Sequence, residues 1–511
     1  MADNLVAGFN YAKTEPGYFE KRTLKRSAGF WGIWGLGVAA VISGEFSGWN
    51  LGSADAGFGG MAIATVIVII MYFTMLFSIG EMSAALPHTG GAYSFARAAL
   101  GPWGGFITGL AESIEYVVTT AVVVYFAAQY ADSALLDFFG IHGSVGLTWI
   151  TWAVLYAVFL LVNGLGAAIG FRLAIIVSIL SIAILALFVI LAFATGTFSV
   201  DKLFDVKPTA GNSTFLPHGF GPVLLVIPFA MWFFLGIEEL PLASEETKNP
   251  QRDIPRAGIV ALVTLLICAV AVFIVNTGVN GSLAIQKSGQ PLLDGFALMV
   301  PKGLTGVLAI FALIGLLASL QGIMFAYGRN LYSLSRAGYY PKALSVTGKR
   351  QTPVLALVVG AVIGFVLLIV VDRATAAGGT AATIGGAIVL NIAIWGAVVS
   401  YLMQMVSFIV LRRKFPKAKR PYVSPTGIAG ALVAGVIALA IFIAFLFNPG
   451  YQIAIAAIAV VYIIGLLLFG FIGRKRLVLS PEEEFALSGG LHGDPQIEGY
   501  DAMESEVFDN K

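Results

Sequence analysis

Five glutamates lie within stretches that are otherwise apolar enough to cross a membrane: Glu45, Glu112, Glu115, Glu238 and Glu239. A charged side chain at the centre of a bilayer costs about 2.5–3.5 kcal/mol even on a lenient insertion scale, so such residues face the protein interior and usually have a partner. No lysine or arginine lies at the same depth in these stretches. We therefore expect either that some of the carboxyl groups are protonated, or that the missing partner is a cationic ligand.

Two of the apolar stretches are interrupted near their centres. The first contains Ser43, Gly44, Glu45 and Gly48 (VISGEFSGWN, residues 41–50), and the second contains Gly236, Glu238, Glu239 and Pro241 (residues 228–256). A break exposed to lipid would leave backbone groups unpaired, at several kcal/mol each, so each break must be buried or line a cavity. Interrupted helices in corresponding positions of two halves indicate a transporter's binding site.

The composition is that of a polytopic membrane protein. Of the 511 residues, 58% are hydrophobic and 11% are charged, whereas soluble domains have about 25% charged residues. The single cysteine, Cys268, excludes an intrachain disulfide and a cysteine-based metal site, and the four histidines form no ligand spacing. We find no nucleophile–base constellation and no phosphate loop, so we expect no catalytic residues, metal or cofactor.

Hydrophobic runs of about 20 residues predict twelve spanning helices and an all-α fold. They lie near residues 30–51, 60–86, 103–130, 146–165, 172–195, 219–240, 256–278, 303–334, 353–371, 383–411, 424–447 and 451–473. With both termini inside, 25 of the 30 basic residues fall on the inner side. This imbalance is what the positive-inside rule expects of a plasma-membrane protein with cytoplasmic termini.

The order of the spans predicts five domains or segments. They are a cytoplasmic arm (1–28), a first repeat of spans 1–5 (29–195), a second repeat of spans 6–10 (219–411), two further spans (424–473) and a disordered acidic cytoplasmic tail (480–511). Each repeat begins with a broken helix, which matches two inverted five-helix repeats. In that geometry the breaks face each other near the bilayer midplane.

Motifs along spans 1–10 resemble the amino acid–polyamine–organocation permeases. They are ISG at 42–44, GEMSAALPHTGGAYSFARAALGPWGGF at 80–106, IEY at 114–116, SEETKNPQRDIPRA at 244–257 and GRNLYSLSRAGYYP at 328–341. Within that superfamily, VISGEFSGWNLG and FARAALGPWGGF are most similar to the ethanolamine permeases. The resemblance implies the inverted-repeat fold, with substrate bound between broken spans 1 and 6 and with spans 3, 8 and 10 closing the sides. It also implies that Trp232 is an aromatic gate over the substrate and that Glu238 lies just below it.

We expect the substrate-binding residues to come from both breaks and from spans 3 and 10. The candidates are Ser43, Gly44, Glu45, Trp49, Glu115, Trp232, Phe233, Gly236, Glu238 and Trp395. Trp232 and Trp395 are the first and second choices for a cation–π face. Each glutamate keeps an alternative: Glu45 could cap a helix end, Glu115 could be structural, and Glu238 could be ligand, gate or proton carrier.

The coupling ion stays open at this point. Some proton-coupled members of the superfamily have a lysine midway along span 5, where this chain has Ser181, so a lysine-based proton mechanism is in doubt. Ser181 and Ser319 are a weak indication of sodium. A monovalent cationic substrate needs no coupling ion, because the membrane potential contributes about 2.3 kcal/mol per 100 mV.

The leading hypothesis is a secondary carrier that imports ethanolamine or a similar small amine through the lipid bilayer by alternating access, with proton coupling as an option. The alternative within the class is an amino acid or polyamine permease or exchanger. From other classes, a non-transporting sensor lacks a sizeable soluble output domain, and an enzyme lacks a catalytic constellation. Nothing indicates a nucleic-acid partner, and the sequence gives no oligomeric state.

Overall fold

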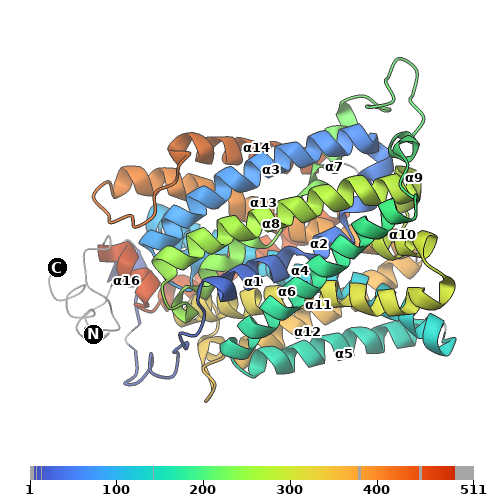
Figure 1. Ribbon diagram of the computed structural model, residues 1–511. Coiled ribbons are helices and arrows are strands. Elements are labelled where there is room, and N and C mark those ends of the chain that lie inside the picture. Colours follow the sequence, from blue (N-terminus) through green and yellow to red (C-terminus); the bar gives the residue numbers. More distant parts are fainter. Residues whose placement is uncertain are drawn as a thin grey trace.

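The computed structural model describes residues 5–6, 8–12, 14–141, 143–377, 381–447 and 452–488. Long helices form a bundle with α16 at one end and α9 and α10 at the other (Figure 1). We call these the terminal end and the distal end. The chain up to α6 runs through β1 (Leu5–Val6), β2 (Phe9–Asn10), α1 (Phe30–Val41), α2 (Ser43–Phe46), η1 (Trp49–Gly52), α3 (Ser53–Ala85), α4 (Gly91–Phe139), α5 (Val145–Gly164) and α6 (Ala167–Ala194).

The second half repeats this pattern. It contains η2 (Val200–Phe204), α7 (Gly221–Met231), η3 (Ile237–Glu246), α8 (Pro250–Asn280), α9 (Ser282–Ile285), α10 (Pro291–Met299), α11 (Lys302–Arg336), η4 (Lys342–Ser345), α12 (Val354–Ala377) and α13 (Ala381–Lys414). The chain then continues through α14 (Gly427–Phe447), α15 (Gln452–Phe471), η6 (Gly473–Lys475) and α16 (Pro481–Ser488).

The described helices confirm the predicted fold class. Ten are long and apolar enough to cross a membrane, and two shorter apolar stretches, Phe30–Phe46 and Gly221–Met231, contain or end at the breaks. Together they occupy the twelve predicted spans. The long helices are apolar on nearly all sides, as expected where one face meets lipid and the other meets neighbouring helices.

Packing between the halves follows the exchange that an inverted repeat requires. Span 1 (α1) packs on span 7 (α8), and span 6 (α7) packs on span 2 (α3). Likewise span 3 (α4) packs on span 10 (α13), while span 8 (α11) packs on span 5 (α6). If spans 1–5 are exchanged with spans 6–10, the contact between spans 1 and 7 becomes the contact between spans 6 and 2. In the same way, the contact between spans 3 and 10 becomes the contact between spans 8 and 5. Each broken helix therefore packs on a helix of the opposite half.

The predicted start of span 3 was later than the observed helix. Helix α4 begins at Gly91, but Gly101 adopts φ 82° and ψ −175°, followed by Pro102. Because proline cannot donate the next helical hydrogen bond and glycine tolerates positive φ, this pair separates a first helical segment from the predicted span 103–130.

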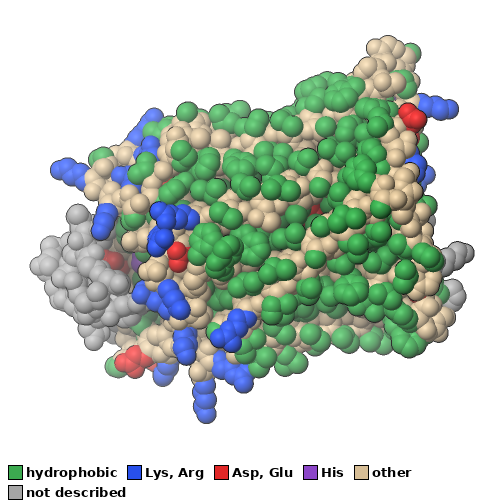
Figure 2. All heavy atoms as spheres, viewed as in Figure 1, with side chains coloured by type: hydrophobic (Ala, Val, Ile, Leu, Met, Phe, Trp, Pro, Cys, Tyr) green, Lys and Arg blue, Asp and Glu red, His purple; other side chains and the backbone are tan. Residues whose placement is uncertain are grey.

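Basic side chains gather towards the terminal end on the face shown in Figure 2.

One segment contradicts the prediction made for it. The disordered acidic tail was predicted from residue 480, yet Pro481–Ser488 forms α16, with Glu482, Glu483 and Glu484 all buried. The composition favoured a solvated segment, but basic and hydroxyl groups from other elements bind the carboxylates of Glu482 and Glu483, as described below. Residues 489–511 of the predicted tail lie outside the described residues.

Candidate functional site

The break in span 1 is held open by a hydroxyl group from span 8. In an uninterrupted helix the amide of Ser43 would donate to the carbonyl of Ala39. Instead it donates to Ser319 Oγ at 2.9 Å, and that hydroxyl donates to the Ala39 carbonyl at 2.8 Å. A side chain inserted into the helical hydrogen-bond ladder is a recognised cause of helix kinks. Ser319 thus satisfies both backbone groups that the break leaves free.

Span 1 then ends in a short turn that is anchored from span 3. The Phe46 carbonyl accepts a hydrogen bond from the Tyr130 hydroxyl at 2.9 Å. Gly48 has φ 98°, a conformation that favours glycine, and its amide donates to Asn50 Oδ1 at 3.0 Å. These contacts fix α2 as a separate segment between α1 and α3.

The break in span 6 begins at the end of α7 and continues into a tight helix. Gly236 has φ 106°, and its amide donates to Glu238 Oε2 at 3.2 Å. The following segment, η3, is a 3₁₀ helix with Pro241 inside it. Because 3₁₀ runs longer than about four residues are uncommon, the extended η3 marks a segment whose geometry is imposed by its surroundings.

The two breaks are in direct contact, as the inverted-repeat geometry requires. A Cβ added at Gly44 would lie 2.2 Å from the Trp232 carbonyl oxygen and 3.2 Å from Phe233 Cα. A Cβ at Gly48 would lie 2.6 Å from Nε1 of Trp232. Glycine at both positions therefore lets the backbone of span 1 approach the backbone and indole ring of the span-6 break.

Aromatic rings pack around this contact. Trp49 stacks on Phe233 with ring centroids 5.2 Å apart, and Phe273 of α8 meets the edge of Trp49 at 5.8 Å. Trp232 is 3% exposed and Phe233 is fully buried, so the contact is closed to solvent. The Nε1 atom of Trp232 has no hydrogen-bond partner among the described residues.

A carboxyl cluster joins the span-6 break to spans 3 and 10. Glu238 and Glu115 lie within hydrogen-bonding reach of each other. The Tyr401 hydroxyl donates to Glu115 Oε1 at 3.5 Å, and it lies 3.1 Å from the hydroxyl of Tyr72. The Tyr72 hydroxyl in turn lies 3.5 Å from the carbonyl of Met231, the last residue of α7. Glu115, Glu238, Tyr401 and Tyr72 thus form one buried polar cluster between spans 2, 3, 6 and 10.

The remaining glutamates occupy separate surroundings. Glu45 is fully buried, and neither of its oxygens has a hydrogen-bond partner among the described residues. Both carboxylate oxygens of Glu239 are equally unpartnered in that part of the chain. Glu112 differs, since Asn330 donates to it at 3.1 Å and Tyr116 at 3.3 Å. The bond from Asn330 links Glu112 of α4 to α11.

Trp395 is the candidate that the structure does not bring to the breaks. Its ring packs against the rings of Phe442 in α14 and Tyr462 in α15, with centroid distances of 5.4 Å and 5.6 Å. Helix periodicity alone could not reveal this orientation, because the three residues on either side of Trp395 are all apolar. Tyr401, two turns later on the same helix, faces the carboxyl cluster instead.

An open vestibule lies above the first break at the distal end. It has a volume of about 490 Å³, and its polar lining includes Gln129, Asp132, Ser133, Lys287, Gln290 and Asp294. The Ser47 hydroxyl donates to the carbonyl of Gly289 in its wall at 2.8 Å, which connects the vestibule to the end of α2. The charged residues of this lining are two aspartates and one lysine, so the vestibule has a surplus of acidic groups.

Sequence reasoning missed the hydroxyl groups that organise the site. Ser319 was noted only as a weak indication of a sodium site with Ser181. In the structure Ser181 Oγ donates to Val177 within its own helix, so these two hydroxyls have separate partners. Tyr72 carried no local signal, because a single tyrosine in an apolar run is common in spanning helices.

Comparisons with known proteins identify the family of this chain. The family model of the amino acid permeases matches residues 32–479. An uncharacterized transporter of Rhizobium meliloti is 27% identical over 86% of this chain and 90% of its own length. The branched-chain amino acid permease BcaP of Bacillus subtilis is 27% identical over 90% of this chain and 96% of its own. The methylthioribose transporter of the same organism is 25% identical over 80% of this chain and 85% of its own. The chain is a multi-pass membrane transporter that belongs to the amino acid permease family.

Proposed function

We propose that the chain is a secondary carrier that moves ethanolamine, or an organic amine of similar size, across the plasma membrane by alternating access. One observation carries the proposal. In the described part of the chain, no ion pair involves Glu45, Glu115, Glu238 or Glu239, although all four are buried in the spans. Buried carboxylates are costly without a partner, and an ammonium group supplies one.

The surroundings of the breaks support a small cationic substrate. Trp232, Phe233 and Trp49 line the contact between the two broken spans, and aromatic faces attract cations by about 2 kcal/mol or more when desolvated. The close approach of Gly44 to Trp232 leaves little width between the breaks in this closed state. The acidic vestibule at the distal end would raise the local concentration of a cation.

An amino acid is the second candidate, and the relatives support it. One relative is named a branched-chain amino acid permease and another a gamma-aminobutyric acid permease. Both substrate classes carry an ammonium group. They differ in the carboxylate of the amino acid, which would lie close to Glu45 or Glu238 and be repelled by either side chain if that side chain is ionised.

The orientation and coupling are part of the proposal. Basic residues concentrated at the terminal end support cytoplasmic termini in a bacterial inner membrane. The adjacency of two buried carboxyl groups, Glu115 and Glu238, supports proton coupling, because such a group can bind a proton that a cationic substrate displaces. Transport driven by the membrane potential alone is the other option.

Substitution of single carboxylates tests the site. Glu45→Gln and Glu238→Gln each keep the side-chain size and remove the charge, and Glu239→Gln is the matched control, since it is also buried and lies next to Glu238. We expect binding of labelled ethanolamine to weaken about tenfold or more in the first two variants and less in the control. Equal weakening in all three would remove Glu45 and Glu238 as specific ligands.

A further inference from the structure

Helix α16 places three consecutive carboxylates inside the protein. Glu482 and Glu483 are fully buried and Glu484 is 4% exposed. Burial of ionised carboxylates is costly unless each is paired and hydrogen-bonded. The partners of α16 therefore decide what this helix does.

Glu483 is bound to the first segment of α4, which precedes span 3, and to the N-terminal arm. Arg97 of α4 donates to its carboxylate at 2.7 Å, and so does the Tyr11 hydroxyl at 2.7 Å. The Tyr339 hydroxyl, just after span 8, donates at 2.8 Å. Arg97 also donates to Tyr11 at 2.7 Å, which completes a closed network of charge-assisted hydrogen bonds.

Glu482 is bound to the end of span 8. Arg336 donates to its carboxylate at 2.6 Å and Ser333 at 2.7 Å. Arg336 also binds Glu245 at 2.6 Å, at the end of η3 and hence of broken span 6. Burial raises the pKa of the Glu482 carboxyl, but the charges of Arg336 and His88 outweigh it and hold this pKa at about 2, so the group is ionised at neutral pH.

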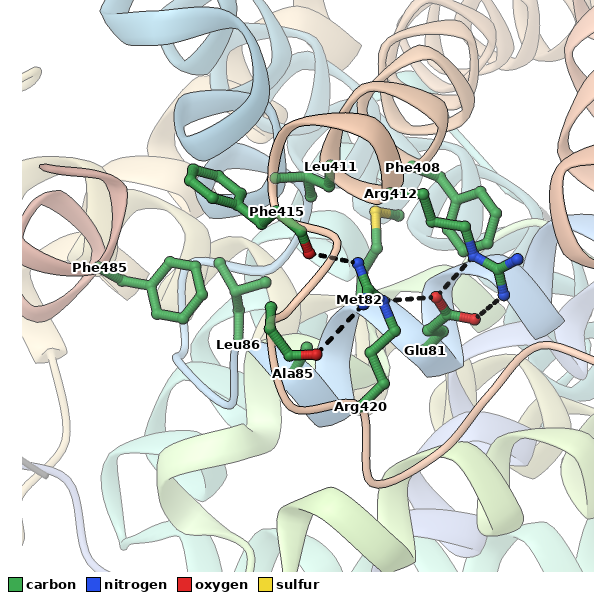
Figure 3. A pocket seen from close by; sticks show the side chains of 11 residues that line it. Glu81, Met82, Ala85, Leu86, Phe408, Leu411, Arg412, Phe415, Arg420 and Phe485 are labelled. Atoms are coloured by element: carbon green, nitrogen blue, oxygen red, sulfur yellow. Dashed lines mark hydrogen bonds and ion pairs between the residues drawn. The ribbon is translucent and has the colours of Figure 1, made fainter. Parts of the chain in front are cut away.

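Apolar and backbone contacts seat the helix at the terminal end. Phe485 reaches the hollow at the ends of α3 and α13, where Arg412 and Arg420 bind Glu81 (Figure 3). The strand-like segment before α16 pairs with its neighbours as well. Val478 donates to the carbonyl of Ala337 at 2.9 Å, and the Leu477 carbonyl accepts from Ala12 at 2.8 Å.

We propose that Pro481–Ser488 is an acidic latch that holds the terminal end closed and must release before the transporter opens there. Alternating access moves the broken spans and the helices packed on them against the surrounding helices. The latch contacts the end of α11 and, through Arg336, the end of η3, and its Phe485 reaches the end of α3. Separation of these elements is incompatible with an intact latch.

This inference depends on the alternating access proposed above, but it does not depend on which amine is carried. Its test is hydrogen–deuterium exchange of the full chain in lipid nanodiscs, without any transported solute. A failure of ethanolamine uptake would therefore leave the test intact, and a failure of the latch would leave the substrate assignment intact.

The test variant is Glu482→Gln/Glu483→Gln, and the control is Glu15→Gln/Glu20→Gln, which makes the same charge change at exposed positions of the arm. We expect amides in residues 91–100, 237–246 and 333–340 to exchange about tenfold faster or more in the test variant. Residues 282–299 at the distal end should be unchanged, and so should the control variant. Unchanged exchange at the terminal end, or an equal increase at both ends, would overturn the latch.

A reversible cross-link tests the same idea without loss of packing. A Cβ at Gly90 would lie 3.0 Å from Cγ of Glu482, close enough for a disulfide between cysteines at both positions. In a Cys268→Ala background, the oxidised Gly90→Cys/Glu482→Cys variant should exchange more slowly over residues 237–246 than its reduced form. The single Gly90→Cys variant controls for crowding against Ser94, whose Cβ would lie at 2.9 Å. Identical exchange in the two redox states would contradict the proposal.

Discussion

The contact between the two breaks makes a direct prediction for Gly44→Ala. The added methyl carbon would lie 2.2 Å from the Trp232 carbonyl oxygen and 3.0 Å from its carbonyl carbon. These are backbone atoms, which cannot move aside by a rotamer change. Since an ordinary contact is about 3.4 Å or longer, the two broken spans would have to separate by roughly 1.2 Å.

The expected loss follows from that overlap. Overpacking of a well-packed interior costs about 1–3 kcal/mol, which lowers the population of the closed state roughly 5- to 150-fold. We expect the rate of ethanolamine uptake into proteoliposomes to decrease by the same factor, roughly 5- to 150-fold. Membrane insertion, checked by the amount of folded protein recovered in detergent, should stay close to that of the original chain.

The matched control is Gly164→Ala at the end of α5. A Cβ there meets no atom within 4 Å, and alanine is preferred to glycine in helices by up to about 1 kcal/mol. This variant should transport normally and be at least as stable. Full activity of Gly44→Ala would refute the claim that the breaks meet backbone to backbone in the transport cycle.

Three further predictions concern the helix ends and the latch. Ser319→Ala leaves two backbone groups of the span-1 break unpaired, so we expect a loss of about 1–3 kcal/mol in unfolding free energy together with lower uptake, whereas Ser319→Thr keeps the hydroxyl. Arg329→Met leaves Glu246 buried and unpaired and should cost about 3–5 kcal/mol, and Arg329→Met/Glu246→Leu should recover most of that loss in thermal unfolding. The depressed pKa of Glu482, about 2 against an ordinary 4.5, means that its ion pair with Arg336 stabilises the fold above pH 4.5 and is lost only as the pH falls towards 2. The difference in melting temperature between the original chain and Glu482→Gln should therefore persist from pH 8 to pH 5, and a difference that disappears within this range would contradict the assignment.

The sequence predicted the fold because spanning helices follow from local hydrophobicity. The breaks were also visible, since Gly44, Gly236 and the buried glutamates have no place in a continuous span. What the breaks contact was not visible. Ser319 lies 276 residues after Ser43, and a serine in an apolar helix is common, so no local pattern links the two.

The orientation of single side chains was the other limit. Trp395 and Tyr401 belong to one largely apolar helix, and the three residues on either side of Trp395 are all apolar, so periodicity does not say which of the two faces the carboxyl cluster. The acidic segment at residue 482 looked solvated because its partners, Arg97 and Arg336, come from distant helix ends. Composition describes what a segment is made of, but burial of a charge depends on tertiary partners.

The most direct test of the central claim is uptake of radiolabelled ethanolamine by proteoliposomes that contain the original chain, with an imposed inside-negative potential and, separately, with an imposed proton gradient. If the buried carboxylates bind a cationic substrate, ethanolamine uptake should be saturable. An excess of other small amines should compete with it, and an excess of leucine should not. The amine assignment would be contradicted if the proteoliposomes took up labelled leucine, if excess unlabelled leucine abolished that uptake, and if ethanolamine left it unchanged.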